Sequence, residues 1–139
     1  MFLLDTNVIS ELKKAKTGQA EVRVVRWAQS VATRSLFLSA VTVMELEIGT
    51  RLVERRDLYQ GRLLRSWLDG QVLPAYKGRI FSIDVEVAVQ CAALHVPDRR
   101  SERDALIAAT ALVHGMTVVT RNVVDFVGSG VAVLNPWEG

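Results

Sequence analysis

The chain has 139 residues, of which half are hydrophobic, and its 17 basic and 15 acidic residues leave a formal net charge of +2. This length is enough for one domain with a real core, and the hydrophobic content excludes an intrinsically disordered chain. The charge is too small to demand a nucleic-acid partner, although it permits one. We expect a single domain over residues 1–139.

The chain carries no recognisable targeting or membrane segment. Its opening Met-Phe-Leu-Leu reaches Asp5 without the basic residues that begin a secretory signal. No apolar run approaches the ~18 residues of a membrane span. The single cysteine, Cys91, cannot form an internal disulfide, and its helix-like, apolar surroundings indicate a buried thiol in a reducing compartment. A cytoplasmic protein with no membrane partner is the expectation.

Short apolar runs alternate along the chain with segments of helical periodicity. Strands are predicted at 2–4, 36–41, 79–83, 117–120 and 131–134, and helices at 8–14, 21–31, 42–56, 58–68, 85–94 and 101–114. Short apolar strands separated by helices indicate a mainly parallel sheet that is covered on both faces. The predicted fold class is therefore α/β, as a three-layer α/β/α sandwich.

Acidic residues stand at four places where an apolar segment ends or a helix begins. They are Asp5, Glu45, Asp104 and Asp125. An α/β fold brings strand ends and the following helix starts to one edge of the sheet, where ligands bind. Carboxylates gathered at such an edge repel one another unless a cation joins them. The pattern therefore predicts a divalent metal ion and, with it, a phosphate substrate.

Each of these acids also has a purely structural explanation. Thr42 and Ser101 each stand three residues before one of the acids, as in a helix capping box. Asp5 would equally well cap the first helix, and Asp125 would be a turn residue. Taken singly, the structural and the functional interpretations both stay open.

The helix faces favour the functional interpretation. The same-face neighbours are Ile48, Gly49 and Leu52 for Glu45, and Ile107, Ala108 and Ala111 for Asp104. An acid on an apolar, inward face is costly unless it is paired or bound to metal. Glu47, by contrast, faces Arg51 and should form an ordinary exposed ion pair. Met44 is expected in the core.

Two groups of basic residues are candidates for guiding a phosphate substrate to this site. They are Arg51, Arg55, Arg56, Arg62 and Arg65 in the middle of the chain, and Arg99, Arg100 and Arg103 just before Asp104. Phosphate contacts from such residues give an affinity that weakens with salt. The alternative is a solvated helix face whose arginines pair with nearby acids.

Four segments together resemble the PIN-domain ribonucleases, of the kind found as VapC-type toxins in type II toxin–antitoxin pairs. The segments are Leu-Leu-Asp5-Thr-Asn-Val-Ile-Ser, Leu-Ser-Ala-Val-Thr-Val-Met-Glu45-Leu, Asp104-Ala-Leu-Ile-Ala-Ala-Thr-Ala and Thr-Val-Val-Thr-Arg-Asn-Val-Val-Asp125-Phe. The closing Asn135-Pro136-Trp137 is similar to the FitB-like branch. The resemblance covers almost the entire chain.

The resemblance implies a metal-dependent endoribonuclease that leaves a 5′-phosphate. Asp5, Glu45 and Asp104 match the acidic metal-site residues, with Asp5 and Asp104 as direct Mg²⁺ ligands and Glu45 direct or through water. Mn²⁺ should substitute, because it favours similar oxygen ligands. In many members an acid directly follows Thr-Arg; here Asn122 stands there, and Asp125 is the alternative fourth acid.

The resemblance also implies partners. These are an RNA substrate, a small antitoxin that carries a DNA-binding domain, and a second copy of the chain in a homodimer or larger assembly. The exposed helices around Trp67 and residues 51–65 are the expected antitoxin surface.

Two other classes of function are kept as alternatives. One is a phosphatase with Asp5 as its nucleophile, although that pattern wants a second Asp where Asn7 stands. The other is a catalytically weak PIN-fold binding module that acts mainly through its complex with antitoxin and DNA.

Overall fold

The structure is a computed structural model that describes residues 1–139. Five parallel strands form one sheet in the order β3-β2-β1-β4-β5. The strands are β1 (Phe2–Leu4), β2 (Leu36–Ser39), β3 (Ile80–Phe81), β4 (Thr117–Val119) and β5 (Val133–Leu134). The predicted parallel sheet is confirmed, and β1 is its central strand.

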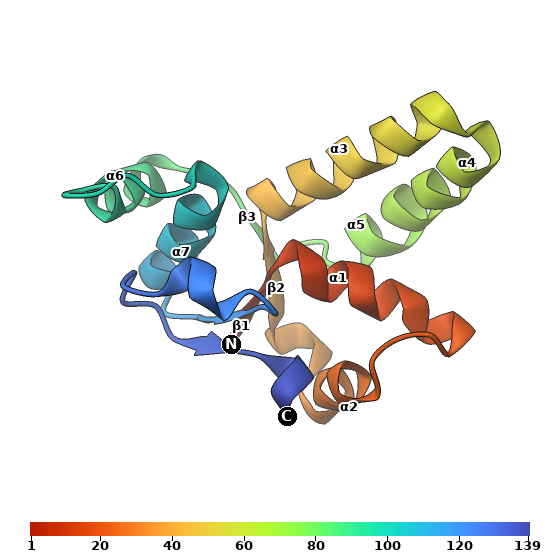
Figure 1. Cartoon of the computed structure of the whole chain (residues 1–139), viewed down its shortest axis with the longest axis horizontal. Coiled ribbons are helices and arrows are strands. Elements are labelled where there is room, and N and C mark those ends of the chain that lie inside the picture. The colour runs from red at the N-terminus through yellow and green to blue at the C-terminus, as the bar shows by residue number, and fades with distance from the viewer.

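Helices connect these strands and cover both faces of the sheet. They are α1 (Thr6–Lys13), α2 (Val22–Ser30), α3 (Ala40–Arg56), α4 (Leu58–Trp67), α5 (Leu73–Ala75), α6 (Val85–Leu94) and α7 (Glu102–His114). Turns of 3-10 helix lie at Lys14–Thr17, Thr33–Ser35, Val123–Phe126 and Pro136–Glu138, and a π-helical turn, Leu68–Val72, joins α4 to α5. Figure 1 shows α1 and α2 on one side of the sheet and α6 and α7 on the other. No helix combines the length and the apolar character needed to cross a lipid bilayer.

Alternate residues of the central strands fill two separate cores. Leu4 is fully buried in a cluster with Val8 of α1, whereas Leu3 is buried in another cluster with Ile107 of α7. This alternation follows from the two-residue period of a strand, which sends successive side chains to opposite faces. The three-layer α/β/α sandwich predicted from the sequence is therefore confirmed.

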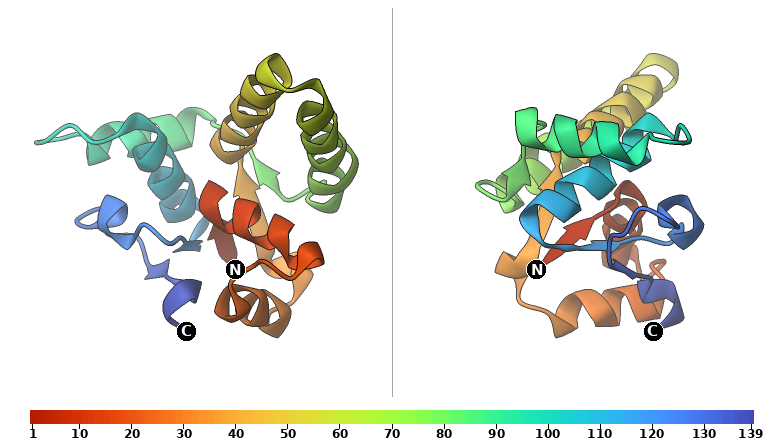
Figure 2. Two further views of the ribbon diagram at one scale, coloured as in Figure 1. Left: turned by 45° about the vertical axis from the view of Figure 1, so that its right-hand side comes forward. Right: turned by 90° about the vertical axis from the view of Figure 1, so that its left-hand side faces the viewer.

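Helices α3 and α4 form a hairpin that projects beyond the sheet (Figures 1 and 2). Their close packing depends on Gly61, which is buried against the backbone of Glu54. Arg65 of α4 crosses the hairpin and donates hydrogen bonds to Glu47 and Glu54, at 2.7 Å and 2.9 Å for the shortest bond to each. The predicted Glu47–Arg51 pair is also present, at 2.6 Å.

Helix α3 begins earlier than its predicted start at residue 42. The side chain of Ser39 accepts a hydrogen bond of 3.0 Å from the backbone N–H of Val41 and so caps the helix at Ala40. The preceding strand consequently ends at Ser39 and does not continue to residue 41.

The side of α3 that was predicted to face the core is exposed. Met44 was expected in the core but is 43% exposed, and Ile48 and Leu52 are exposed as well. The buried positions of this helix beyond its first turn are Leu46 and Thr50. The apolar spacing that suggested an inward face is present, but no other part of the chain covers it.

Candidate active site

A polar cavity of about 470 Å³ opens at the carboxyl edge of the sheet. It is lined by Asp5, Thr6, Asn7, Ser10, Glu11, Lys14, Glu45, Asp104, Arg121, Asn122 and Trp137. Asp5 directly follows β1, Glu45 lies in the second turn of α3 after β2, and Asp104 lies in the first turn of α7. Three of the four acids singled out in the sequence therefore face one cavity.

Asp5 is buried and is held by hydrogen bonds at both carboxylate oxygens. Its Oδ1 accepts from the backbone N–H of Thr6 at 2.8 Å, which makes Asp5 the N-cap of α1. Its Oδ2 accepts from the hydroxyl of Thr120 at 2.8 Å and from the Asn7 amide at 3.3 Å. Asp5 therefore caps α1, as its structural interpretation predicted, and it also lines the cavity.

Burial raises the pKa of Asp5 above its usual value. The hydrogen bonds from Thr120 and Thr6 oppose this effect, because they stabilise the charged form, and the nearby charge of Glu45 raises the pKa further. The carboxylate is thus fixed in direction, yet its negative charge is poorly solvated.

Glu45 lies in α3, which follows β2, and contacts α1, which follows β1. The hydroxyl of Thr6 donates a hydrogen bond of 2.7 Å to its Oε1, and a guanidinium nitrogen of Arg103 lies 3.6 Å from its Oε2. A capping-box role is wrong for Glu45, because α3 begins at Ala40 under the cap of Ser39 and Glu45 lies beyond its first turn.

Asp104 brings the third carboxylate to the cavity from the first turn of α7. Burial raises its pKa, and so do the charges of Asp125, Asp5 and Glu45, in that order. The N-terminal position favours the ionised form, because the dipole of α7 is positive at this end. Ser101 precedes α7 as its N-cap residue but accepts no capping hydrogen bond through its side chain. The predicted buried face of α7 is confirmed by Ile107 and its neighbours.

Neither Asp125 nor Asn122 has both the charge and the position expected for a fourth acid. Asp125 is exposed in the 3-10 turn Val123–Phe126 and does not line the cavity, although its charge reaches Asp104. Asn122 lines the cavity, and its backbone N–H donates to the Thr120 hydroxyl at 3.0 Å. The Thr120 hydroxyl therefore connects the backbone of Asn122 to the carboxylate of Asp5.

The donors at this site fit a hard divalent cation that is bound by few protein ligands. No three acidic, histidine or cysteine side chains are placed to hold one ion together. Mg²⁺ commonly uses one or two protein carboxylates and completes its octahedral shell with water and substrate phosphate oxygens. The charge of Asp5 raises the pKa of Asp104, and that of Glu45 raises the pKa of both, which is the electrostatic condition that a cation relieves.

Half of the eight arginines predicted to guide the substrate have partners away from the cavity, namely Arg51, Arg65, Arg99 and Arg100. Arg65 is paired with Glu47 and Glu54, and Arg100 donates to the backbone oxygens of Leu94 and Val127. Arg103 alone among them contacts an acid of the cavity. The sequence interpretation missed Arg121, which lines the cavity because it directly follows the strand-end residue Thr120.

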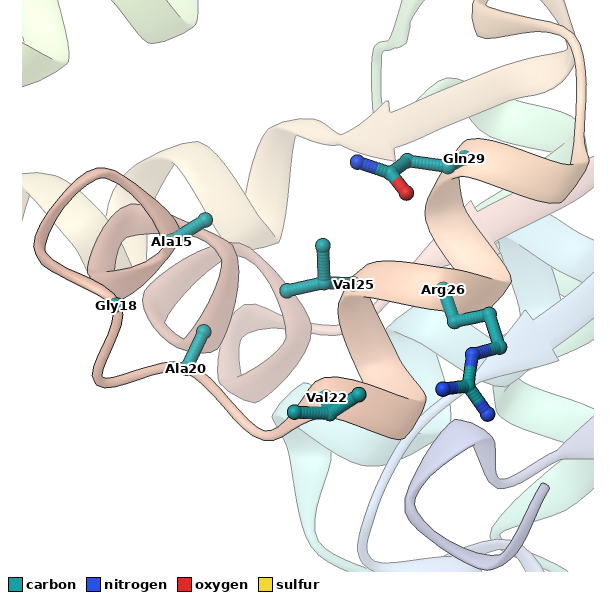
Figure 3. Close-up of a pocket in the computed structure, with 7 residues that line it drawn as sticks. All are labelled: Ala15, Gly18, Ala20, Val22, Val25, Arg26 and Gln29. Carbon is teal, nitrogen blue, oxygen red and sulfur yellow. The ribbon is translucent and has the colours of Figure 1, made fainter.

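A second hollow, of about 370 Å³, lies away from the carboxylates between α2 and the turn Lys14–Thr17. It is lined by Ala15, Gly18, Ala20, Val22, Val25, Arg26 and Gln29 (Figure 3). Small apolar side chains form most of its wall, and it holds no carboxylate. The guanidinium of Arg26 points away from the other lining residues in Figure 3, so nothing there resembles a catalytic site.

Known proteins match this chain in sequence and in fold. The sequence profile of the PIN domain matches residues 2–124. The chain belongs to the PIN-domain family. As a PIN-domain chain it is 39% identical to VapC ribonuclease Y4jK of Sinorhizobium fredii and 38% identical to Toxin FitB of Neisseria gonorrhoeae, each over 99% of both chains.

Solved structures agree over the same length. The crystal structure of FitAcB from Neisseria gonorrhoeae superimposes with a TM-score of 0.90 at 38% identity and covers 100% of both chains. A structure of FitAB bound to a DNA fragment gives a TM-score of 0.87 at 37% identity, over 99% of this chain and 96% of that one. The PIN-like α/β fold of this chain is therefore that of the FitB relatives from end to end.

Proposed function

We propose that this PIN-domain protein is a divalent-metal-dependent endoribonuclease that acts as the toxin of a toxin–antitoxin pair. The observation that carries the proposal is the sharing of one cavity by Asp5, Glu45 and Asp104, with the pKa of Asp5 and of Asp104 raised. The full-length similarity to a VapC ribonuclease and to Toxin FitB supports the choice of RNA as substrate.

Each acidic residue has a defined part in the proposed reaction. Asp5 and Asp104 would bind Mg²⁺ directly, and Glu45 would act through a bound water, because no three acidic side chains are placed to hold one ion together. The ion, when bound, supplies positive charge that offsets the phosphodiester charge and makes water more acidic. Thr120 and Asn7 fix the orientation of the Asp5 carboxylate, and Thr6 fixes that of Glu45.

We assign the fourth position to Asn122, whereas Asp125 acts through the effect of its charge on Asp104. The place of Asn122 in the cavity wall favours a neutral oxygen or amide at this point, whereas Asp125 contributes charge from outside the lining. Asp125→Asn should therefore weaken cleavage less than Asp104→Asn does.

The direct test is cleavage of a single-stranded RNA by the purified protein with Mg²⁺, Mn²⁺ or EDTA. Cleavage with either ion and its loss in EDTA are expected, and the products should carry a 5′-phosphate. Asp104→Asn should abolish cleavage, while Glu102→Gln, an exposed acid of the same helix that pairs with Arg99, should keep it. Equal cleavage by wild type and Asp104→Asn would contradict the assignment.

The same experiment separates the alternatives. A phosphatase would form a phosphoenzyme at Asp5 with a small phosphate ester, yet Asn7 offers an amide donor where that pattern needs a second acid. A catalytically weak binding module would show no RNA cleavage with either metal and would still bind its partner.

We also propose that the chain assembles with an antitoxin that carries a DNA-binding domain, and with a second copy of itself. The similarity to FitB in structures of FitAcB and of FitAB with DNA supports this. The α3–α4 hairpin near Trp67 is the proposed contact, since α4 exposes Leu58, Tyr59 and Leu63. Co-purification with the product of a neighbouring short reading frame tests it, and Tyr59→Glu should weaken that complex.

A further inference from the structure

The cavity is lined by more acidic than basic side chains, so it offers an RNA phosphate few protein donors. Four carboxylates line the cavity, and only two cationic side chains, Lys14 and Arg121, line it with them. An RNA phosphate that approaches this wall is repelled unless a fixed cation receives it. The site therefore needs a protein donor for phosphate besides its ion.

Lys14 is poorly suited to that task. Its ammonium lies 3.3 Å from the Oε1 of Glu11, so its charge is partly neutralised. Glu11 is itself held in place, because its Oε2 accepts a hydrogen bond of 2.8 Å from the backbone N–H of Glu21. The Lys14 side chain is also exposed, and a flexible alkyl stem loses entropy when it is fixed.

Arg121 is also exposed, but it is unpaired and rests against an aromatic ring. No carboxylate lies within ion-pair distance of its guanidinium, and its side chain donates no hydrogen bond within the protein; Glu21, whose pKa its charge helps to lower, is paired with Arg23. The guanidinium rests over the ring of Trp137, with its central carbon 5.5 Å from the ring centroid. Trp137 is buried, and its backbone N–H donates to Asn135 at 2.9 Å, so the ring is a fixed platform.

The backbone of Arg121 is tied to the catalytic edge as well. Its N–H donates a hydrogen bond of 3.1 Å to the side-chain oxygen of Asn7, and Asn7 in turn donates to Asp5. The preceding residue, Thr120, holds the same carboxylate. The backbone of Arg121 is thus linked to Asp5 through Asn7 and through Thr120.

We propose that Arg121 binds a phosphate of the RNA at the mouth of the acidic cavity and positions the chain for cleavage. A guanidinium offers a planar pair of donors that matches two phosphate oxygens, and stacking on an aromatic ring limits its rotation before the RNA arrives. This inference rests on the proposed ribonuclease function and adds to it a substrate-binding residue outside the carboxylate set.

The test compares RNA affinity in variants that carry Asp104→Asn, so that no cleavage occurs. The probe is a short fluorescent single-stranded RNA in Mg²⁺ buffer, measured by anisotropy over a range of salt concentrations. Arg121→Ala should lower the affinity about tenfold, as the loss of one charge-assisted bidentate contact predicts. It should also make the salt dependence shallower, by a slope of about 0.7 for one single-strand phosphate.

Two further variants make the result specific. Arg121→Lys should restore the salt slope but only part of the affinity, because an ammonium cannot bind phosphate through two parallel donors. Arg34→Ala removes an exposed arginine in the turn before β2, at the edge of the sheet opposite the cavity, and should change the affinity less than about twofold. An affinity for Arg121→Ala equal to that of Arg34→Ala would overturn the inference.

Steady-state cleavage by otherwise wild-type protein separates this inference from the proposed function. Arg121→Ala should raise KM more than it lowers kcat. Wild-type cleavage that Arg121→Ala leaves unchanged would overturn the role of Arg121 alone. Wild-type RNA binding that depends on Arg121, but with no cleavage in either metal, would overturn the ribonuclease function and leave the phosphate contact standing.

Discussion

The packing of α4 against α3 predicts opposite effects for the same substitution at two glycines. A Cβ added at Gly61 would lie 2.6 Å from the Cα and 2.8 Å from the Cγ of Glu54. The nearer of these two atoms belongs to the backbone, so a change of rotamer cannot relieve the clash and the two helices must move apart. At Gly49, on α3, an added Cβ meets no atom within 4 Å.

The magnitudes follow from two competing contributions. Alanine is favoured over glycine inside a helix by about 1 kcal/mol, and both glycines lie in helices. Overpacking a close contact costs about 1–3 kcal/mol, and a clash with backbone belongs at the upper end. Gly61→Ala should therefore lower the free energy of unfolding by ~1–2 kcal/mol, and Gly49→Ala should raise it by ~0.5–1 kcal/mol.

Urea titrations followed by far-ultraviolet circular dichroism measure both effects, with thermal melting as a second readout. A change of 1 kcal/mol should move Tm by ~3 °C for a chain of this length. Gly61→Ala that is as stable as wild type, together with the expected gain for Gly49→Ala, would show that α4 does not pack on Glu54 as described.

Three further predictions concern the charges. Asp104 has a raised pKa, so its contribution favours the fold below the unfolded value of 3.8 and is lost as pH rises through the folded value; Asp104→Asn should make the metal-free protein more stable at neutral pH, in urea titrations with EDTA. Thr120→Val removes the 2.8 Å hydrogen bond to Asp5, which should cost ~1–2 kcal/mol and move the acid limb of the RNA-cleavage pH profile to higher pH. Arg65 lowers the pKa of Glu47 to about 2. The contribution of this pair to folding stability is therefore fully present above pH 4.5 and is lost as pH falls through about 2. Arg65→Met should weaken this dependence of Tm on acid pH in thermal melts.

Local patterns in the sequence were sufficient for the layers of the fold. The two-residue alternation at Leu3 and Leu4, and the four-residue spacing that begins at Ile107, each follow from the geometry of a single element. The boundary at Ser39 was missed because one side-chain hydrogen bond ended the strand against a continuing apolar pattern. Burial of α3 was overestimated because periodicity shows where an apolar face lies and not whether another element covers it.

The site was predictable where one residue type at a strand or helix end carries the signal, as with Asp5 and Asp104. It was not predictable where the role depends on which partners are absent. The role proposed for Arg121 depends on the absence of a paired acid, whereas Arg65, of the same type, is held between Glu47 and Glu54. Such a difference depends on contacts between residues that are distant in the sequence.

The N-cap position of Asp5 determines which inactive variant can be trusted. Asp5→Ala removes a proposed metal ligand and also the cap of α1, so lost activity in that variant would mix a chemical effect with a folding one. Asparagine caps helices about as well as aspartate, and Asp5→Asn therefore isolates the charge. For a protein proposed to be toxic to its host, this distinction decides whether a variant that does not inhibit growth is folded but inactive or is simply unfolded.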